Sequence, residues 1–270
     1  MGVGRIAGSR SGLLALGVFA LLGAGGAWGA WAPTGGYLAG HEPDTVAVVP
    51  QVPTPGSVRD QADRDIFKAT RALEGSPRWA LAQNDAKIDL PAVLKDFSCA
   101  AGVSLTPQDA PALIKVLTGM VPDVAPAYSR PKDLYKRPRP YLRDKGNICL
   151  PDTPDLHQSF DYPSGHATFA WTWGLILADL MPDRAGAILA RARSIGESRV
   201  VCGVHSASAI TEGRTAGSTL FAALQSDPVF QTDMAKARDE LAALRASPAA
   251  PPPGSDACAA EAALIAKTPW

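Results

Sequence analysis

The sequence has no excess of charge of either sign, little cysteine and no long hydrophobic run beyond its N-terminal segment. Its 26 basic and 26 acidic residues cancel, so no overall field draws the protein towards nucleic acid or an anionic membrane. We therefore expect no nucleic-acid partner, and any positively charged site must be local. No later segment has the roughly 20 apolar residues that cross a bilayer, which argues against a membrane protein with several spanning helices.

Residues 1–30 have the composition of a secretory signal peptide. Two arginines precede an apolar run of 12 residues, Leu13–Ala24, and small residues follow it. This order of positive charge, apolar core and small residues is typical of a cleaved leader. The alternative is an uncleaved anchor, for which the run is short. We expect cleavage between Gly26 and Ala32, export to a bacterial periplasm, and no membrane contact after the leader is removed.

The four cysteines include no C-x-x-C pair, which argues against a zinc or thiol redox site. In an exported protein an even number of cysteines predicts disulfides. Three pairings are open, and we favour Cys99 with Cys149 and Cys202 with Cys258. Buried free thiols are the alternative.

Turn signals and periodicity predict a single all-α domain. Residues 31–56 are rich in proline and glycine and predict an extended lead-in, and residues 247–270 predict a proline-rich linker and a C-terminal tail. Between them, residues 57–246 have apolar positions at helical spacing. No segment alternates as β-strands joined by hairpins do. A chain of 270 residues with 46% hydrophobic content can bury one substantial core.

Capping signals predict where several helices begin. Gly75-Ser76-Pro77 ends one helix and starts the next, and Asp227-Pro228 caps a last long helix. Thr106-Pro107, with Asp109 in the first turn, predicts another helix start.

Two segments differ in how much of their surface is apolar. Gly165–Met181 is apolar nearly all round, which predicts the central buried helix. Asp183–Glu197 has an apolar stripe opposite Arg184, Arg191 and Arg193, so we expect one face of this helix to be buried and its arginines to lie on the other.

Three segments concentrate groups that suit phosphate. Seven basic residues lie between Arg130 and Lys145, although a charge run alone is usually a solvated face. Pro163-Ser164-Gly165-His166 stands directly before the predicted buried helix, whose first N–H groups suit a phosphate oxygen; an ordinary cap is the alternative. Ser198-Arg199 then precedes His205, which adds a guanidinium fork and a candidate nucleophile.

The order and spacing of the three segments resemble the signature of the type 2 phosphatidic acid phosphatase (PAP2) superfamily. Lys132 is followed after six residues by Arg139-Pro140, then Pro163-Ser-Gly-His166 follows, and five residues separate Ser198-Arg199 from His205. The intervals of 22 and 31 residues between the segments also resemble those of the family.

The resemblance spans residues 57–214 and, through Arg71–Trp79, points to the bacterial class A nonspecific acid phosphatases. It implies metal-independent hydrolysis of small phosphomonoesters at mildly acidic pH, with no cofactor, through a phosphohistidine intermediate. It also suggests a homo-oligomer. His205 would be the nucleophile and His166 the general acid. The other residues implied for the site would bind the phosphate: Lys132, Arg139, Ser164, Gly165 and Arg199.

The sequence departs from the family pattern at one position. Four residues after the nucleophilic histidine the family has an aspartate that orients the ring, and this sequence has Ala209. Glu212 would lie about 10 Å along the helix axis from His205, too far to replace it. Ser208, a backbone carbonyl or a distant carboxylate such as Asp161 would have to hold the ring. A phosphate-binding relative with weakened or lost catalysis is therefore the alternative function.

Two further functions within the family are disfavoured. Vanadate-dependent haloperoxidases are much longer chains than this one, and membrane lipid phosphatases need several spanning helices. The remaining two histidines, His41 in the lead-in and His157 in a surface loop, are expected to have no role.

Overall fold

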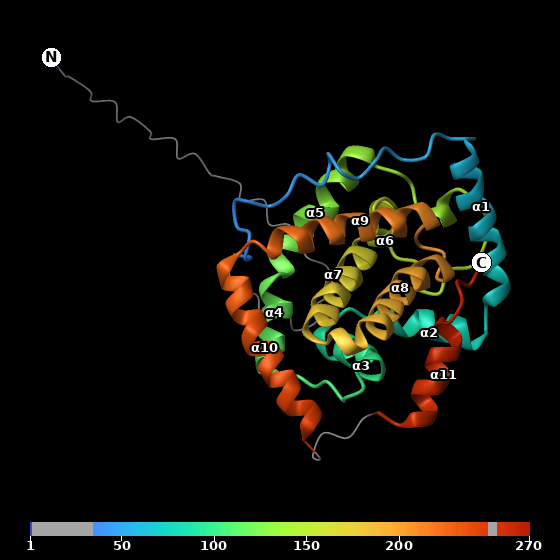
Figure 1. Ribbon diagram of the computed structural model, residues 1–270. Helices are drawn as coiled ribbons and strands as arrows, with labels where there is room; N and C mark the ends of the chain where they lie inside the picture. The colour runs from blue at the N-terminus through green and yellow to red at the C-terminus, as the bar shows by residue number, and fades with distance from the viewer. Residues whose placement is uncertain (2–34, 248–252) are drawn as a thin grey trace.

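All regular secondary structure is helical in the part of the chain that the computed structural model describes, which is residue 1 and residues 35–247 and 253–270. The all-α prediction is confirmed (Figure 1). None of the described helices is both long and apolar enough to cross a membrane. All but the first residue of the predicted signal peptide lies outside the described residues. The helices in chain order are α1 (Val58–Thr70), α2 (Pro77–Asn84), α3 (Leu90–Ala101), α4 (Pro111–Gly119), α5 (Val121–Tyr135), α6 (Pro154–Gln158), α7 (Gly165–Leu180), α8 (Ala185–Val201), α9 (Ala207–Leu224), α10 (Pro228–Ala246) and α11 (Ser255–Ile265).

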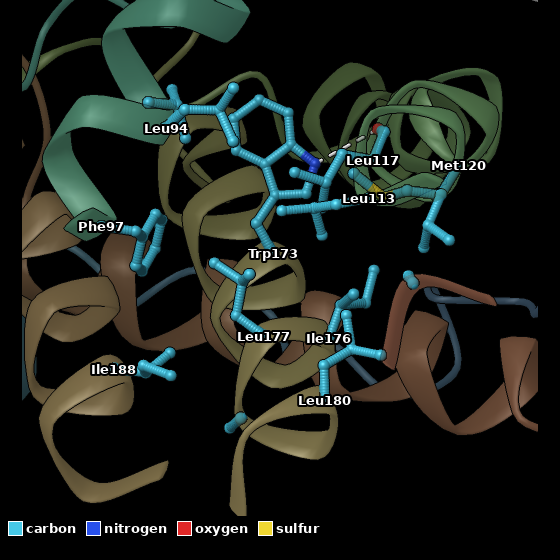
Figure 2. Packing of buried hydrophobic residues seen from close by; sticks show 14 of the residues in the cluster. Leu94, Phe97, Leu113, Leu117, Met120, Trp173, Ile176, Leu177, Leu180 and Ile188 are labelled. Atoms are coloured by element: carbon cyan, nitrogen blue, oxygen red, sulfur yellow. Dashed lines mark hydrogen bonds between the residues drawn. The ribbon is translucent and has the colours of Figure 1, made fainter. Parts of the chain in front are cut away.

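Helix α7 is the centre of the fold, as its sequence predicts. It packs along α8 and α9, and α4 pairs with α10 at one side of the molecule (Figure 1). The indole of Trp173 is buried and donates its Nε1–H to the carbonyl oxygen of Leu117 at 3.3 Å (Figure 2). Around it lie Leu94 and Phe97 of α3. Burial of each large apolar side chain of this kind contributes about 1.5–3 kcal/mol, so α7 is held from several sides.

Two glycines allow α9 to approach the first turns of α7 closely. A Cβ atom at Gly213 would lie 2.6 Å from the carbonyl oxygen of Ser164, and one at Gly217 would lie 3.0 Å from that of Thr168. Both neighbours are backbone atoms that cannot rotate away, so these positions accept no side chain without movement of a helix. The contact fixes the segment 163–166 against α9.

The structure confirms two of the predicted helix starts and corrects the third. Ser76 caps α2 and Asp227 caps α10. The helix predicted at Thr106 is wrong, because residues 106–109 form a turn and α4 begins at Pro111. A proline disfavours helical backbone in the residue before it, and Ala110 is accordingly non-helical, with φ −135° and ψ 55°.

Arg191 of α8 was predicted to lie on an exposed polar face, and this prediction is wrong. Its side chain is 0% exposed, and its Nη2 lies 2.6 Å from Oδ1 of Asp85 and 3.3 Å from Oδ1 of Asp96. Its Nε lies 3.3 Å from Oε2 of Glu261, a residue of α11. Because α2, α3 and α11 all contact α8, the face that was predicted to be polar and outward is covered, and its arginine is paired inside.

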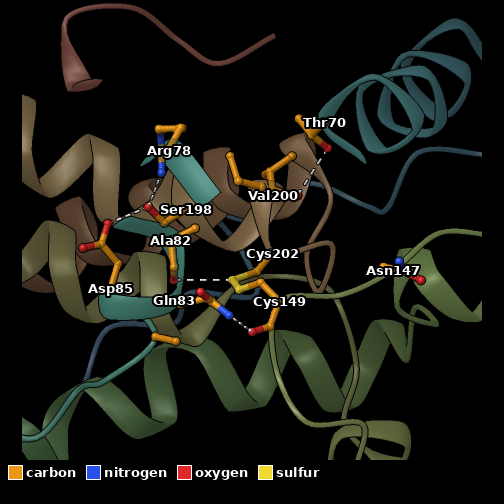
Figure 3. Close-up of a disulfide and its surroundings, with 12 residues drawn as sticks. Thr70, Arg78, Ala82, Gln83, Asp85, Asn147, Cys149, Ser198, Val200 and Cys202 are labelled. Atoms are coloured by element: carbon orange, nitrogen blue, oxygen red, sulfur yellow. Dashed lines mark hydrogen bonds between the residues drawn. A yellow bond between two sulfur atoms is a disulfide. The ribbon is translucent and has the colours of Figure 1, made fainter. Parts of the chain in front are cut away.

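Both predicted disulfide pairings are wrong. Cys99 at the end of α3 is bonded to Cys258 of α11, with Cα atoms 5.3 Å apart. Cys149 is bonded to Cys202, with Cα atoms 4.5 Å apart (Figure 3). The backbone explains the second bond, because the N–H of Cys149 donates to the carbonyl oxygen of Cys202 at 3.1 Å. Closeness in the sequence did not predict the pairing, because the C-terminal tail folds back so that Cys258 of α11 lies beside Cys99 of α3.

The described part of the lead-in, residues 35–56, has no helix and lies against the domain. The N–H groups of Tyr37 and Leu38 donate to the carboxylate of Asp123 at 2.9 and 3.1 Å. Further along, the hydroxyls of Tyr135 and Tyr162 each donate at 2.9 Å to a backbone carbonyl of this segment. The lead-in is therefore held by hydrogen bonds to α5 and to the segment directly before α7.

Candidate active site

Lys132 lies in the last turn of α5. Its Nζ donates to the carbonyl oxygen of Phe160 at 2.8 Å and lies 5.9 Å from the centre of the Tyr128 ring. Burial, followed by the positive charge of Arg139, lowers the pKa of Lys132 to about 7. The lysine is thus close to losing its proton at neutral pH.

Arg139 lies in the loop after α5, and its side chain is buried. Its Nε and Nη2 donate to Oγ of Ser159 at 3.1 and 2.8 Å, and its Nη1 donates to the carbonyl oxygen of Val204 at 2.6 Å. The same Nη1 lies 3.2 Å from Nε2 of His205. Burial lowers the pKa of Arg139, but a guanidinium keeps its charge in proteins. The contact brings one of the predicted phosphate ligands to the predicted nucleophile.

Arg199, in the last turn of α8, is the most unusual cation of the site. Its side chain is 3% exposed, and within the described part of the chain its Nε and Nη1 have no hydrogen-bond partner. Burial and then the charge of Arg139 lower its pKa to about 9. Ser198 before it is buried too, and its hydroxyl donates to Asp85 at 2.5 Å (Figure 3). Unpaired buried donors on a cation are costly, and an anion bound beside Arg199 would satisfy them.

Ser164 and Gly165 begin α7 beside these cations. Ser164 is the N-cap, since its Oγ accepts from the N–H of Ala167 at 3.3 Å, and its own N–H donates to the carbonyl oxygen of Ala209 at 3.0 Å. Gly165 is the first helical residue, and a Cβ there would lie 3.2 Å from the Tyr128 ring. The start of a helix offers free N–H groups and a partial positive charge, which adds to the field of the arginines.

His205 lies between α8 and Ser206, the N-cap of α9. It is 2% exposed, and its Nδ1 lies 2.6 Å from the carbonyl oxygen of Asp161 and 3.1 Å from Oδ1 of the same residue. Burial, and then the charges of Arg139 and Lys132, hold its pKa well below the usual value. The ring is therefore neutral, and with two acceptors at Nδ1 the proton belongs there. Its Nε2 carries the lone pair.

His166 follows in the first turn of α7, with Nε2 3.3 Å from the carbonyl oxygen of Ala86. Burial, then Arg199 and His205, lower its pKa well below the usual value. Each histidine is thus within the electrostatic reach of the other and of Arg199. Electrostatic interactions thus connect five of the seven residues that the sequence analysis assigned to the site, Lys132, Arg139, His166, Arg199 and His205. Ser164 and Gly165 directly precede His166.

The other two histidines lie apart from this cluster. His41 is exposed in the lead-in, and His157 on α6 lies 2.5 Å from Oδ1 of exposed Asp152. Among the described residues no group of three or more His, Cys, Asp or Glu side chains is arranged to hold a metal ion.

Comparison with known proteins places the chain in a family. It is 41% identical to an acid phosphatase of Zymomonas mobilis over 72% of this chain and 74% of that protein. It is 34% identical to a non-specific acid phosphatase of Providencia stuartii over 75% of this chain and 82% of that protein. A model of the PAP2 superfamily matches residues 111–230. The chain belongs to the PAP2 superfamily, among its acid phosphatases.

Similarity to a solved PAP2 structure is slighter. The transmembrane PAP2 type phosphatidylglycerolphosphate phosphatase from Bacillus subtilis shares 19% of its sequence with this chain, with a TM-score of 0.41. The superposition covers 65% of this chain and 86% of that one.

At position 209 this PAP2 chain has a buried alanine in an apolar cluster, where the sequence analysis looked for an aspartate. Ala209 is 0% exposed and lies among Val49, Tyr162 and Ala216. Its methyl group makes no polar contact, and Ala209 contacts the site only through its backbone: its carbonyl accepts from the N–H of Ser164 and its N–H donates to Oγ of Ser206 at 3.3 Å. Ring orientation must therefore come from another residue.

A buried ionic cluster behind His205 was not foreseen as part of the site. The N–H and hydroxyl of Ser206 donate to the Asp161 carboxylate at 2.9 and 2.7 Å. Arg137 lies 3.3 Å from the same carboxylate, 2.9 Å from Asp63 and 3.2 Å from Asp60. Arg137 was one of seven cations in a basic run, and nothing in the sequence separates it from its exposed neighbours. Asp161 was named only as one of several candidates.

Proposed function

We propose that this chain hydrolyses phosphate monoesters without a metal ion, through a phosphohistidine formed at Nε2 of His205. The observation that carries the proposal is Arg199, a buried guanidinium whose Nε and Nη1 have no partner among the described residues. Its neighbours Arg139 and Lys132 are also buried or partly buried cations. Three cations around a neutral histidine suit a phosphate dianion and its transition state, because phosphoryl transfer depends mainly on positioning and charge neutralisation.

Binding uses the cations and the start of α7 together. Arg199 and Arg139 donate to the phosphate oxygens, and Lys132 adds a third positive charge. The free N–H groups at the start of α7 and the hydroxyl of Ser164 would donate to the same oxygens. Phosphate also competes with Nε2 of His205 for Nη1 of Arg139, which frees the lone pair of the ring for attack.

The reaction then proceeds in two steps. Nε2 of His205 attacks phosphorus, the P–O bond to the leaving alcohol breaks, and protonated His166 gives that oxygen its proton. In the second step His166, now neutral, takes a proton from water while the water oxygen attacks phosphorus and the P–N bond breaks. Inorganic phosphate leaves, and both histidines return to their starting states.

The two histidines need different protonation states, and the site can supply them. The low pKa of His205 keeps the nucleophile neutral in acid. The pKa of His166 is lowered by burial and by Arg199, and a bound phosphate dianion opposes the effect of that arginine. His166 is therefore protonated mainly when substrate is bound and the pH is low, so we expect activity to be highest at mildly acidic pH.

Hydrolysis of an aryl phosphate by the purified protein in EDTA tests the proposal. We expect turnover by the wild type, none by His205→Ala, and an acid-labile, alkali-stable phosphoprotein after a rapid quench. A wild type that binds phosphate but never turns substrate over would support the phosphate-binding alternative and overturn the proposal.

We also propose that the mature protein is exported to the periplasm, where it acts on small phosphomonoesters. Both disulfides lie in the described part of the chain, and such bonds persist in oxidising compartments. Fractionation of cells that express the full chain tests this, and retention in the cytoplasm would contradict it. The homo-oligomer suggested by the resemblance stays a prediction, for which sedimentation of the mature protein is the measurement.

A further inference from the structure

We propose that Asp161 is the positioning residue for the nucleophile, so that a carboxylate from the loop before α7 replaces the one that Ala209 cannot supply. This inference rests on the function proposed above. Asp161 touches no reacting atom, and it acts on the reaction through the ring of His205.

Two oxygen atoms of Asp161 lie within hydrogen-bond distance of Nδ1 of His205. The backbone carbonyl lies 2.6 Å from Nδ1 of His205, and Oδ1 lies 3.1 Å from it. Since both are acceptors, the Nδ1–H tautomer is favoured strongly over the other. Nε2 is left unprotonated on the side of Arg139, where the proposed attack takes place.

The surroundings of Asp161 are those of an ionised carboxylate. Burial raises its pKa, but every group that contacts its oxygens is a donor: His205 Nδ1–H, the N–H and hydroxyl of Ser206, and Arg137. A protonated carboxyl would present an O–H to one of these donors and leave it unpaired. We therefore infer that Asp161 is ionised, with Arg137 as its countercharge.

The other candidate groups are committed elsewhere. The hydroxyl and N–H of Ser208 both donate to Asp63, the N–H at 2.8 Å. Glu212 pairs with Arg59 at 2.5 Å. Among the residues named as alternatives for holding the ring, Asp161 alone contacts His205.

The charge of Asp161 matters most after the attack. When phosphorus bonds to Nε2 while Nδ1 keeps its proton, the ring becomes a cation. A buried carboxylate 3.1 Å from Nδ1 lowers the energy of that cation far more than it lowers the energy of the neutral ring. The backbone carbonyl orients the ring but carries no full charge, so orientation and charge stabilisation can be separated by mutation.

Asp161→Asn tests the proposal, because it removes the charge and keeps the carbonyl. We expect kcat to fall about 10-fold to 100-fold, less than the ~10⁴-fold loss known for a triad that loses its correct tautomer. The inhibition constant of inorganic phosphate should change less than kcat does, because Asp161 makes no hydrogen bond to a predicted phosphate ligand and acts on Lys132 and Arg139 only through its charge. Asp123→Asn is the matched control: it removes the charge of a buried carboxylate that accepts from backbone N–H groups, as Asp161 does, but lies against the lead-in.

Histidine-labelled ¹⁵N NMR supplies a readout that a structural role would not move. The chain has four histidines, so the His205 signals can be assigned with His205→Ala. In the wild type we expect protonated Nδ1 and unprotonated Nε2, and in Asp161→Asn we expect a weaker Nδ1–H hydrogen bond. A wild-type ring protonated at Nε2 would overturn the proposal, even if the variant failed to fold. A folded Asp161→Asn protein with wild-type kcat would also overturn it, whereas an inactive wild type would overturn the function on which it rests.

Discussion

The guanidinium groups of Arg139 and Arg199 are both buried and interact electrostatically, so that burial and then the charge of Arg139 lower the pKa of Arg199 to about 9. Like charges inside a protein repel each other and have lost their hydration. Arg139 is partly compensated by Ser159 and Val204, whereas Nε and Nη1 of Arg199 have no partner in the described residues. The pair is therefore unfavourable for folding and favourable for binding an anion.

Arg199→Met separates these two effects. Replacement of an unpaired buried cation by an apolar side chain of similar length should raise the free energy of unfolding by about 1–3 kcal/mol. Loss of the phosphate ligand should lower kcat/KM at least about 100-fold. Thermal unfolding with and without phosphate provides the check, since phosphate should raise Tm in the wild type and have little effect in the variant. A lower Tm without phosphate would contradict this account of Arg199.

We predict that Lys132 makes phosphate affinity depend on pH. Because its pKa is lowered to about 7, the lysine loses its charge as the pH rises through that value, and affinity for phosphate should fall. In Lys132→Arg the guanidinium stays charged, so the fall should move to higher pH. Competitive inhibition by inorganic phosphate between pH 5 and 9 measures the shift. The ionisation of phosphate itself is common to both proteins, so identical profiles would mean that Lys132 does not bind phosphate.

Gly213 controls where the N-terminus of α7 lies. In Gly213→Ala the new methyl group would meet the Ser164 carbonyl, 2.6 Å from an ideal Cβ, so α9 must move and carry the segment 163–166 with it. We expect a loss of about 1–3 kcal/mol in stability and a fall in kcat. Gly186→Ala in α8 is the control, because nothing lies within 4 Å of its Cβ, and it should be neutral or stabilising by up to about 1 kcal/mol. Equal effects of the two substitutions would contradict the role given to the close contact.

The two disulfides should differ in what their removal does to activity. Replacement of either pair by serine should cost about 2–5 kcal/mol of stability. Cys202 stands three residues before His205, so loss of the Cys149–Cys202 bond should also lower kcat. Loss of the Cys99–Cys258 bond frees α11, which lies away from the two histidines proposed as catalytic, and kcat of the folded variant should stay near that of the wild type. Circular dichroism melts and initial rates on both double variants decide the point.

Local patterns predicted the parts of this fold that depend on local chemistry. The caps Ser76 and Asp227 and the apolar helix α7 are short-range features, and each is where the sequence placed it. The predicted start of α4 was wrong for a local reason too. Pro111 disfavours helical backbone at Ala110, and this effect outweighed the capping signal at Thr106.

Long-range partners could not be predicted in the same way. In the sequence a buried Arg191 cannot be told from an exposed one, because its countercharges Asp85, Asp96 and Glu261 come from three distant segments of the chain. The disulfides failed for the same reason, because the tail that pairs with Cys99 lies 159 residues away. At the site, the spacing of the motif identified the residues proposed to bind phosphate, but the sequence alone did not single out Asp161 among the groups considered for orienting His205.

The hydrogen bond between Asp63 and Ser208 joins residues 145 positions apart. Formation of such a contact requires closure of a long loop, whose entropy is lost before the contact contributes anything. Asp63 of α1 therefore gains its hydrogen bonds from Ser208 only once α9 has packed, although Arg137 and Arg143 can pair with the carboxylates of α1 before that. We expect the support of the nucleophile to be assembled late in folding, when nearly the whole chain is present, and partly folded forms to lack activity even where α7 has formed.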